Sequence, residues 1–119
     1  MLGEHIRQRR LKLALTQRQA AAQLQVSPWT VLNWERGHTA PPVGALPSIF
    51  LWLGYAPLTP AKSLRERMRQ KRQVMGWTIR EAARQLGVDE ATWRSWEGGG
   101  KVAWPRFRER LEVFLGGAP

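Results

Sequence analysis

The chain of 119 residues contains two copies of one sequence, offset by 62 positions. When the chain is aligned with itself at this offset, without a gap, 20 of 57 positions carry the same residue. The identical pairs span the copies, for example Leu2/Leu64, Thr16/Thr78, Trp34/Trp96 and Pro57/Pro119. The period is too long, and the copies are too few, for a solenoid, so the repeat predicts two small domains of one fold.

A segment with two prolines separates the copies. We predict a first domain at residues 1–55, a linker at residues 56–62 and a second domain at residues 63–119. The prolines make the segment extended and fairly stiff. Its eight residues from Tyr55 to Lys62 reach at most about 26–29 Å, so we expect the two domains to be neighbours.

The composition constrains both the core and the partner. Seven tryptophans and no cysteine indicate aromatic cores without disulfides, which fits a reducing compartment. The net charge is +10, with six Lys/Arg against two Asp/Glu in residues 1–55 and thirteen against seven in residues 56–119. Two basic halves favour a polyanion, most simply nucleic acid, although a solubilising surface is the alternative.

Apolar residues recur at helical spacing and strand alternation is absent, which predicts an all-α protein. Each copy is expected to form four short helices. They are predicted at residues 3–14, 17–24, 28–36 and 44–53, and at residues 64–75, 79–86, 90–97 and 105–115.

Capping residues mark the predicted helix ends. Three capping boxes are expected, at Thr16-x-x-Gln19, Thr78-x-x-Glu81 and Ser63-x-x-Glu66. Single N-caps are expected at Ser27 and Asp89, and glycine C-termini at Gly37 and Gly99.

The second and third helices of each copy are joined by only three residues, at 25–27 and 87–89. Alanines at 20–21 and 82–83 allow these helices to approach closely, as in a helix-turn-helix motif. The first copy reads Arg7-x-x-Arg10 and then LTQRQAAAQLQVSPWTVLNWERG. It resembles the Cro/repressor-type (XRE) helix-turn-helix family, and the second copy resembles it in register. The resemblance implies two tandem lambda-repressor-like domains.

In that family an arginine late in the first helix pairs with a glutamate that ends the third. The matching residues are Arg10 and Glu35 in the first copy, and Arg72 and Glu97 in the second. The copies differ at about two positions in three, yet they share both residues. The resemblance therefore implies two structural ion pairs, each of which sets the angle between two helices.

The third helix of the first copy has two distinct sides. At 100° per residue, Val31 and Trp34 point inward, while Trp29, Asn33 and Arg36 point outward. The outward residues offer a ring for a thymine methyl, an amide for adenine and a cation for guanine or phosphate. The alternatives are that Trp29 packs against its own loop or the other domain, and that Asn33 is only solvated.

The resemblance places base-reading residues at Pro28, Trp29 and Asn33, to which we add Arg36 and, in the second copy, Arg94. It places a phosphate contact at Gln17, where the helix N-terminus also presents backbone N–H groups. Further candidate phosphate ligands are Arg18, His38, Arg65, Arg69, Arg80 and Lys101.

The second copy departs from this pattern. Its outward face holds Ala91, Ser95 and Gly98, which offer little to a base edge, and Ile79 replaces Gln17. The segment 98–100 is predicted to be flexible. Its first helix is strongly basic, with Arg65, Arg67, Arg69, Lys71 and Arg72. This copy is expected either to grip phosphates without reading sequence or to dock against a partner, the alternative being a solvated face.

No pattern indicates catalysis or metal binding. The chain has two histidines and no cysteine, and its carboxylates form no cluster at metal-ligand spacing. We expect no enzyme activity, no cofactor, no metal and no small-molecule substrate. No stretch has the length of a signal peptide or a bilayer span, so we expect a cytoplasmic, nucleoid-associated protein.

These features predict a sequence-specific transcriptional regulator, a repressor, that binds double-stranded DNA mainly through its first copy. One alternative is a protein-interaction module, such as an antitoxin-like or anti-activator component, that uses Trp29 and Trp104. The other is an RNA-binding protein, disfavoured because duplex RNA has a deep, narrow major groove.

The late apolar residues exceed what one four-helix core needs. They are Phe50, Trp52, Tyr55, Trp104 and Phe114. We expect several of them to form an interdomain contact, which would make the chain a covalent pseudo-dimer. A homodimer is the alternative arrangement.

Overall fold

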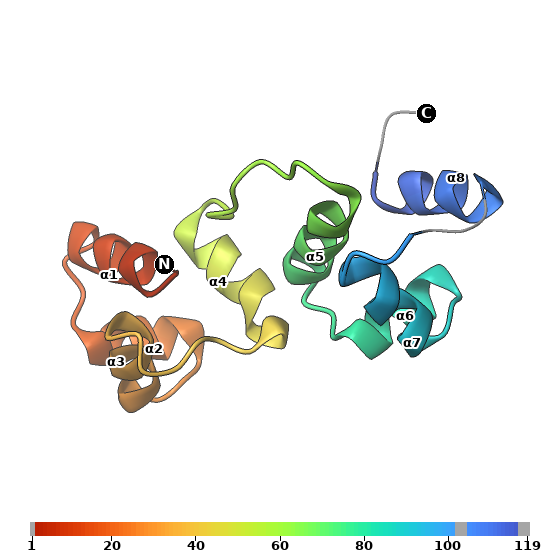
Figure 1. Ribbon diagram of the computed structural model, residues 1–119. Coiled ribbons are helices and arrows are strands. Elements are labelled where there is room, and N and C mark those ends of the chain that lie inside the picture. The colour runs from red at the N-terminus through yellow and green to blue at the C-terminus, as the bar shows by residue number, and fades with distance from the viewer. Residues whose placement is uncertain (1, 102–104, 117–119) are drawn as a thin grey trace. The chain divides into compact units, whose positions relative to one another are not determined.

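The computed structural model describes residues 2–101 and 105–116 (Figure 1). These residues form eight α-helices and one short 3-10 helix, with no strand among them, which confirms the all-α fold class. The chain divides into two compact units, Met1–Leu58 and Thr59–Pro119. The division falls inside the predicted linker.

Unit 1 contains α1 (Leu2–Lys12), α2 (Gln17–Leu24), α3 (Pro28–Glu35), η1 (Val43–Ala45) and α4 (Leu46–Leu53). Its core cluster joins three of these helices through Ile6, Trp34, Ile49 and Leu53. Ala20 and Ala21 are buried on α2, so their small side chains let α2 lie directly against its neighbours. The core therefore holds α3 by one face and leaves the opposite face outside.

Unit 2 contains α5 (Leu64–Met75), α6 (Ile79–Leu86), α7 (Glu90–Glu97) and α8 (Pro105–Phe114). Its core is built from positions equivalent to those of unit 1, with Met68, Trp96 and Leu111 in place of Ile6, Trp34 and Ile49. Trp93 is fully buried where unit 1 has Val31. In both units the helix ends lie within two residues of the predicted ones.

Most of the predicted caps are present. Thr16 and Thr78 each form a full capping box, whereas Ser63 accepts only the Glu66 N–H while Glu66 accepts from the Lys62 N–H. Ser27 accepts from the Thr30 N–H, at 3.1 Å. The prediction for Asp89 is wrong, because it occupies the N-cap position of α7 without any side-chain capping bond.

The two full capping boxes differ in their response to pH. Hydrogen bonds from Thr78 hold the pKa of the Glu81 carboxyl below its usual range. A carboxyl with a depressed pKa stabilises the fold at neutral pH, and that contribution is lost as the pH falls through the lowered pKa. The corresponding residue of unit 1 is Gln19, which is neutral at every pH, so only the capping box of unit 2 weakens in acid.

Three of the five late apolar residues pack within their own units, so for these three the expectation of a surplus over the core is wrong. Phe50 and Trp52 pack against the core of unit 1, and the Trp52 Nε1 donates to Gln23 at 2.8 Å. Phe114 packs in the core of unit 2 against Trp77 and Trp93. Trp104 lies outside the described residues. Of the four that the structure describes, Tyr55 is the exposed one, and its hydroxyl is 2.7 Å from the His5 Nδ1.

Both units need a left-handed backbone conformation at two helix ends, and they use different residues there. Ala14 and Gln25 of unit 1 have φ angles of 56° and 59°. Their equivalents in unit 2 are Gly76 and Gly87, with φ angles of 73° and 84°. A Cβ in this left-handed region contacts the following carbonyl oxygen, so unit 1 carries strain at two helix ends that unit 2 avoids.

We predict that Ala14→Gly stabilises unit 1. Removing the Cβ should raise its free energy of unfolding by about 1 kcal/mol. The matched change Gly76→Ala should lower that of unit 2 by a similar amount. Urea unfolding followed through the NMR amide signals of each unit measures both effects, and a less stable Ala14→Gly unit would contradict the strain.

Candidate nucleic-acid interface

In unit 1, α2 and α3 form a helix-turn-helix with a fixed entry to α3. Gln25 ends α2 in the left-handed conformation, and the Val26 N–H returns to the Ala21 carbonyl at 3.0 Å. Ser27 then caps α3, and Pro28 occupies its first turn. A capped start with a proline fixes the direction in which the first side chains of α3 project.

The two sides of α3 differ sharply in burial. Val31 and Trp34 are buried in the unit, whereas Trp29 is 69% exposed and Arg36 is exposed. Asn33 is partly exposed. Among the residues that the structure describes, none is a hydrogen-bond or ion-pair partner of the Trp29, Asn33 or Arg36 side chains. The alternative in which Trp29 packs against a loop of unit 1 is thus not what the structure has.

The structure brings Arg10 and Glu35 together as a bidentate ion pair. The Arg10 Nε donates to Glu35 Oε2 at 2.7 Å and its Nη2 to Oε1 at 3.0 Å. The Arg10 Nη1 also donates to the Leu15 carbonyl at 3.1 Å, which ties down the chain between α1 and α2. The Glu35 side chain is only 4% exposed. Hydrogen bonding to Glu35 raises the pKa of Arg10, so the guanidinium stays charged.

Gln17 completes this cluster from the first turn of α2. Its Nε2 donates to Glu35 Oε1 at 3.3 Å. The side-chain amide predicted to contact phosphate therefore has a partner inside the unit, and its main effect is to hold the start of α2 against the end of α3. Local sequence patterns do not predict this contact, because it joins residues 18 positions apart on different helices.

Unit 2 satisfies its buried carboxylate with a different third donor. The Arg72 Nη2 donates to Glu97 Oε1 at 2.9 Å, and its Nη1 to the Trp77 carbonyl at 3.3 Å. Ile79 at the Gln17 position cannot donate, but the Trp93 Nε1 donates to Glu97 Oε2 at 2.9 Å. Trp93 stands where unit 1 has Val31. The two substitutions compensate, so Glu97 keeps a full set of donors.

The outward face of α7, the helix of unit 2 that is equivalent to α3, offers few groups to a base. Ala91 and Ser95 are exposed on α7, and Gly98 is exposed directly after it. Arg94, the candidate base reader, donates to Glu90 at 3.2 Å. The 98–100 segment is closed by hydrogen bonds from Gly98, Gly99 and Gly100 to carbonyls of the last turns of α7, and its flexibility stays a prediction. Unit 2 thus keeps the scaffold of unit 1 without its outward chemistry.

The candidate phosphate ligands lie mostly at the surface. Arg18, His38, Arg65, Arg69, Arg80 and Lys101 are all exposed. On α5, however, several basic side chains have partners within the unit. Arg67 binds Glu112 at 2.7 Å, the Arg69 Nε is 3.6 Å from Glu97, and the Lys71 Nζ lies 5.8 Å from the Phe114 ring centre. Arg65 is the basic residue of α5 with least internal bonding in the described part of the chain.

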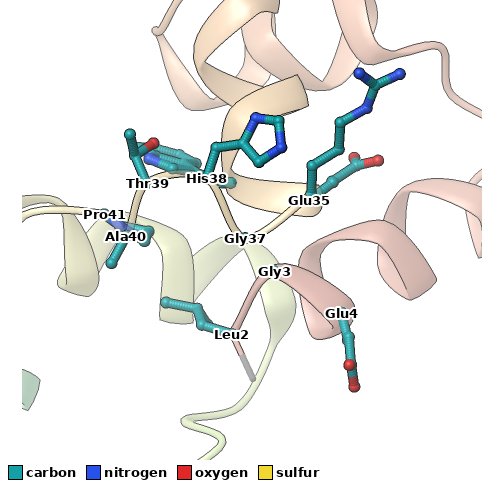
Figure 2. Close-up of a pocket in the computed structure, with 11 residues that line it drawn as sticks. Leu2, Gly3, Glu4, Glu35, Gly37, His38, Thr39, Ala40 and Pro41 are labelled. Atoms are coloured by element: carbon teal, nitrogen blue, oxygen red, sulfur yellow. The ribbon is translucent and has the colours of Figure 1, made fainter.

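Each unit also has a pocket beside the end of the second helix of its helix-turn-helix, α3 in unit 1 and α7 in unit 2 (called the recognition helix below). In unit 1 the pocket has a volume of about 350 Å³ and lies between the start of α1 and the segment after α3. Figure 2 shows Leu2 turned toward the 37–41 segment, while the Glu4 carboxylate points away from it. The pocket of unit 2, at about 390 Å³, is lined by equivalent segments.

Other kinds of site find no support in the described residues. None of their His, Asp and Glu side chains gather in a group of three that could hold a metal ion. No described helix is long and apolar enough to cross a membrane.

The comparisons with known proteins agree with this geometry in unit 1. The helix-turn-helix family model matches residues 6–49, from within α1 to within α4. This segment is thus similar to DNA-binding regulators of the XRE type. The match covers less than half of the chain and only one copy of the repeat. No curated protein and no solved structure matches the chain.

We predict that Glu35→Ala destabilises unit 1 by about 3 kcal/mol, because it leaves the Arg10 guanidinium without its buried partner. Glu97→Ala should do the same in unit 2. Glu4→Ala, on the exposed side of α1, is the matched control and should change the free energy of unfolding by less than about 0.5 kcal/mol. Urea unfolding measures both variants. An equal loss of unfolding free energy in Glu35→Ala and Glu4→Ala would contradict the claim that the Glu35 carboxylate stabilises unit 1.

Proposed function

We propose that the chain is a sequence-specific DNA-binding transcriptional regulator, acting as a repressor, in which unit 1 reads the bases. The observation that carries the proposal is the outward face of α3. Trp29 and Asn33 project there from a helix whose other face is held in the core, and Arg36 follows directly at the helix end. The net charge of +10 supplies the attraction to phosphates that such a reader needs.

The three outward side chains match groups in the major groove of B-form DNA. An asparagine amide binds the N6 and N7 atoms of adenine, an arginine binds guanine or a phosphate, and an apolar ring contacts the thymine methyl. α3 is short, with eight residues, and only its outward side chains reach a base edge. A reader of this size distinguishes a few adjacent base pairs.

The cluster of Arg10, Gln17 and Glu35 supports this reading indirectly. It joins the end of α1, the start of α2 and the end of α3 through bonds of 2.7–3.3 Å. The start of α2 presents its N–H groups to a phosphate while the Gln17 side chain faces Glu35. The phosphate contact and the base contacts are then held in one fixed relation, which sets the register of unit 1 on DNA.

Unit 2 is proposed to add affinity without reading bases. Its outward face carries Ala91, Ser95 and Gly98, and Arg94 is paired with Glu90. Its surface is nevertheless basic, with Arg65, Arg80 and Lys101 exposed. A pseudo-dimer with two heads on one duplex stays a prediction, whose support is the short linker.

The second candidate function is a protein-interaction module. It is favoured by the 69% exposure of Trp29, since an exposed tryptophan is a common anchor in protein interfaces. The two candidates differ in their dependence on salt. DNA binding weakens steeply as salt rises, because phosphate contacts release counterions.

We predict that Asn33→Ala and Trp29→Ala each weaken binding to the selected DNA site by about 1–3 kcal/mol relative to random duplex DNA. The matched control is Ser95→Ala, which changes the equivalent position of unit 2 and should leave the ratio of specific to random binding unchanged. Fluorescence anisotropy at two salt concentrations measures both affinities, and circular dichroism checks the fold.

Two outcomes would overturn the assignment. If both unit 1 variants discriminate target from random DNA as well as the parent chain, α3 is not the reader. If the parent chain binds no duplex even at low salt, the protein-interaction module becomes the better account.

A further inference from the structure

The two repeat-related pockets differ in chemistry, although they occupy the same place in the fold. Each lies between the start of the first helix and the segment after the recognition helix. In unit 1 the pocket is lined by charged residues of both signs, Glu4, Glu35 and Arg36, beside the small or apolar Leu2, Gly3, Ala40 and Pro41 (Figure 2). α1 also comes so close to α3 that a Cβ on Gly3 would lie 2.0 Å from the Trp34 carbonyl oxygen.

In unit 2 the same position as Gly3 is occupied by Arg65, and the pocket gains two further cations. Lys101 follows the recognition helix and Arg108 projects from α8. No Asp or Glu is among the described residues that line this pocket. Within the described part of the chain, none of these three side chains has a carboxylate at ion-pair distance. Three like charges around one cavity repel one another, and a bound anion relieves that repulsion.

Two glycines line the pocket beside Arg65. Gly99 has a φ angle of 103°, and a Cβ there would lie 3.2 Å from the Arg65 Nη1. A Cβ on Gly100 would lie 2.5 Å from the Ser95 Oγ and 2.8 Å from its carbonyl oxygen. The Gly100 N–H is donated to that carbonyl at 2.8 Å. Because residues 99 and 100 have no side chains, the Arg65 guanidinium can lie close to the backbone at the pocket.

We propose that the unit 2 pocket binds a phosphoryl group through Arg65, Lys101 and Arg108. Arginine presents a planar fork that matches phosphate oxygens, and lysine adds a mobile point charge. The three cations come from α5, the segment after α7 and α8, so they can surround an anion from different sides. The volume of about 390 Å³ falls within the range of small-molecule sites, about 300–1,000 Å³, and exceeds what one phosphate fills.

The same chemistry has two sources, a phosphate of the DNA backbone or a free phosphorylated small molecule. For the DNA source the proposal rests on the affinity proposed for unit 2 and names its site, but it is independent of base reading by unit 1, because the pocket lies entirely in unit 2. The site therefore stands or falls separately from the function proposed for α3.

The direct test is an NMR titration of the full chain with inorganic phosphate, compared with sodium chloride at matched ionic strength. The amide signals of Gly99, Gly100 and Lys101 should shift saturably with phosphate and not with chloride. In the double variant Arg65→Gln/Arg108→Gln the apparent affinity should fall about tenfold or more. Arg106→Gln is the matched control, because Arg106 lies on the same helix outside the pocket, and its titration should follow that of the parent chain.

The variant Lys101→Gln is a second test of the pocket, because Lys101 lies on an exposed segment. The spectra themselves report whether each variant is folded. Equal shifts with chloride and phosphate would overturn the proposal. So would a double variant that binds phosphate as the parent does, or an equal loss in Arg106→Gln.

Two further arms identify the source. If it is the DNA backbone, the double variant binds random duplex DNA about tenfold more weakly than Arg106→Gln does. If it is a free molecule, the two variants bind the duplex equally, and ATP as a probe shifts the pocket signals of the parent chain at lower concentration than phosphate. A duplex and a nucleotide that both leave these signals unmoved would overturn the site.

Discussion

The buried carboxylate that ends the recognition helix is the interaction on which each unit depends. Glu35 and Glu97 are almost inaccessible to water, and each receives a bidentate arginine and one further donor. An uncompensated charge in this place would cost several kcal/mol, so the carboxylate requires the first helix to be at a set distance and angle. The arginine also bonds the carbonyl at the end of the turn before the second helix, at Leu15 and Trp77. One ionic cluster therefore positions the three helices of the motif.

The two copies of the repeat show that the buried carboxylate can be satisfied by different neighbouring residues. Unit 1 takes its third donor from Gln17 and keeps Val31 in the core, whereas unit 2 takes it from Trp93 and has Ile79 at the start of α6. Unit 2 preserves the scaffold while its outward face holds small residues. In both copies the interior must supply donors to the buried carboxylate, whereas the surface of each copy is free to differ. This contrast is the physical basis for proposing that the units divide base reading from phosphate binding.

Local patterns in the sequence were enough to predict the helices, because their ends are set by nearby capping residues such as Thr16 and Ser27. The Arg10 and Glu35 contact could be anticipated from the resemblance and the repeat. Contacts between distant helices could not, which is why the Gln17 and Trp93 bonds and the place of Arg108 were missed. The error at Phe50 has the same origin, whereas Asp89 differs, because the bond that it lacks is a local cap. Composition and spacing do not reveal which neighbour a side chain meets once the helices pack.

Selection of preferred sites from a random pool of DNA duplexes tests the central claim most directly. If unit 1 alone reads bases, the selected sites contain one kind of short block, alone or as inverted copies of itself, and Asn33→Ala changes the preferred base within it. The flanking DNA should then carry no preference, since unit 2 is proposed to read no bases. A second, unrelated block at a fixed spacing, unaffected by Asn33→Ala and abolished by Arg94→Ala, would contradict the account, because unit 2 would then read sequence as well.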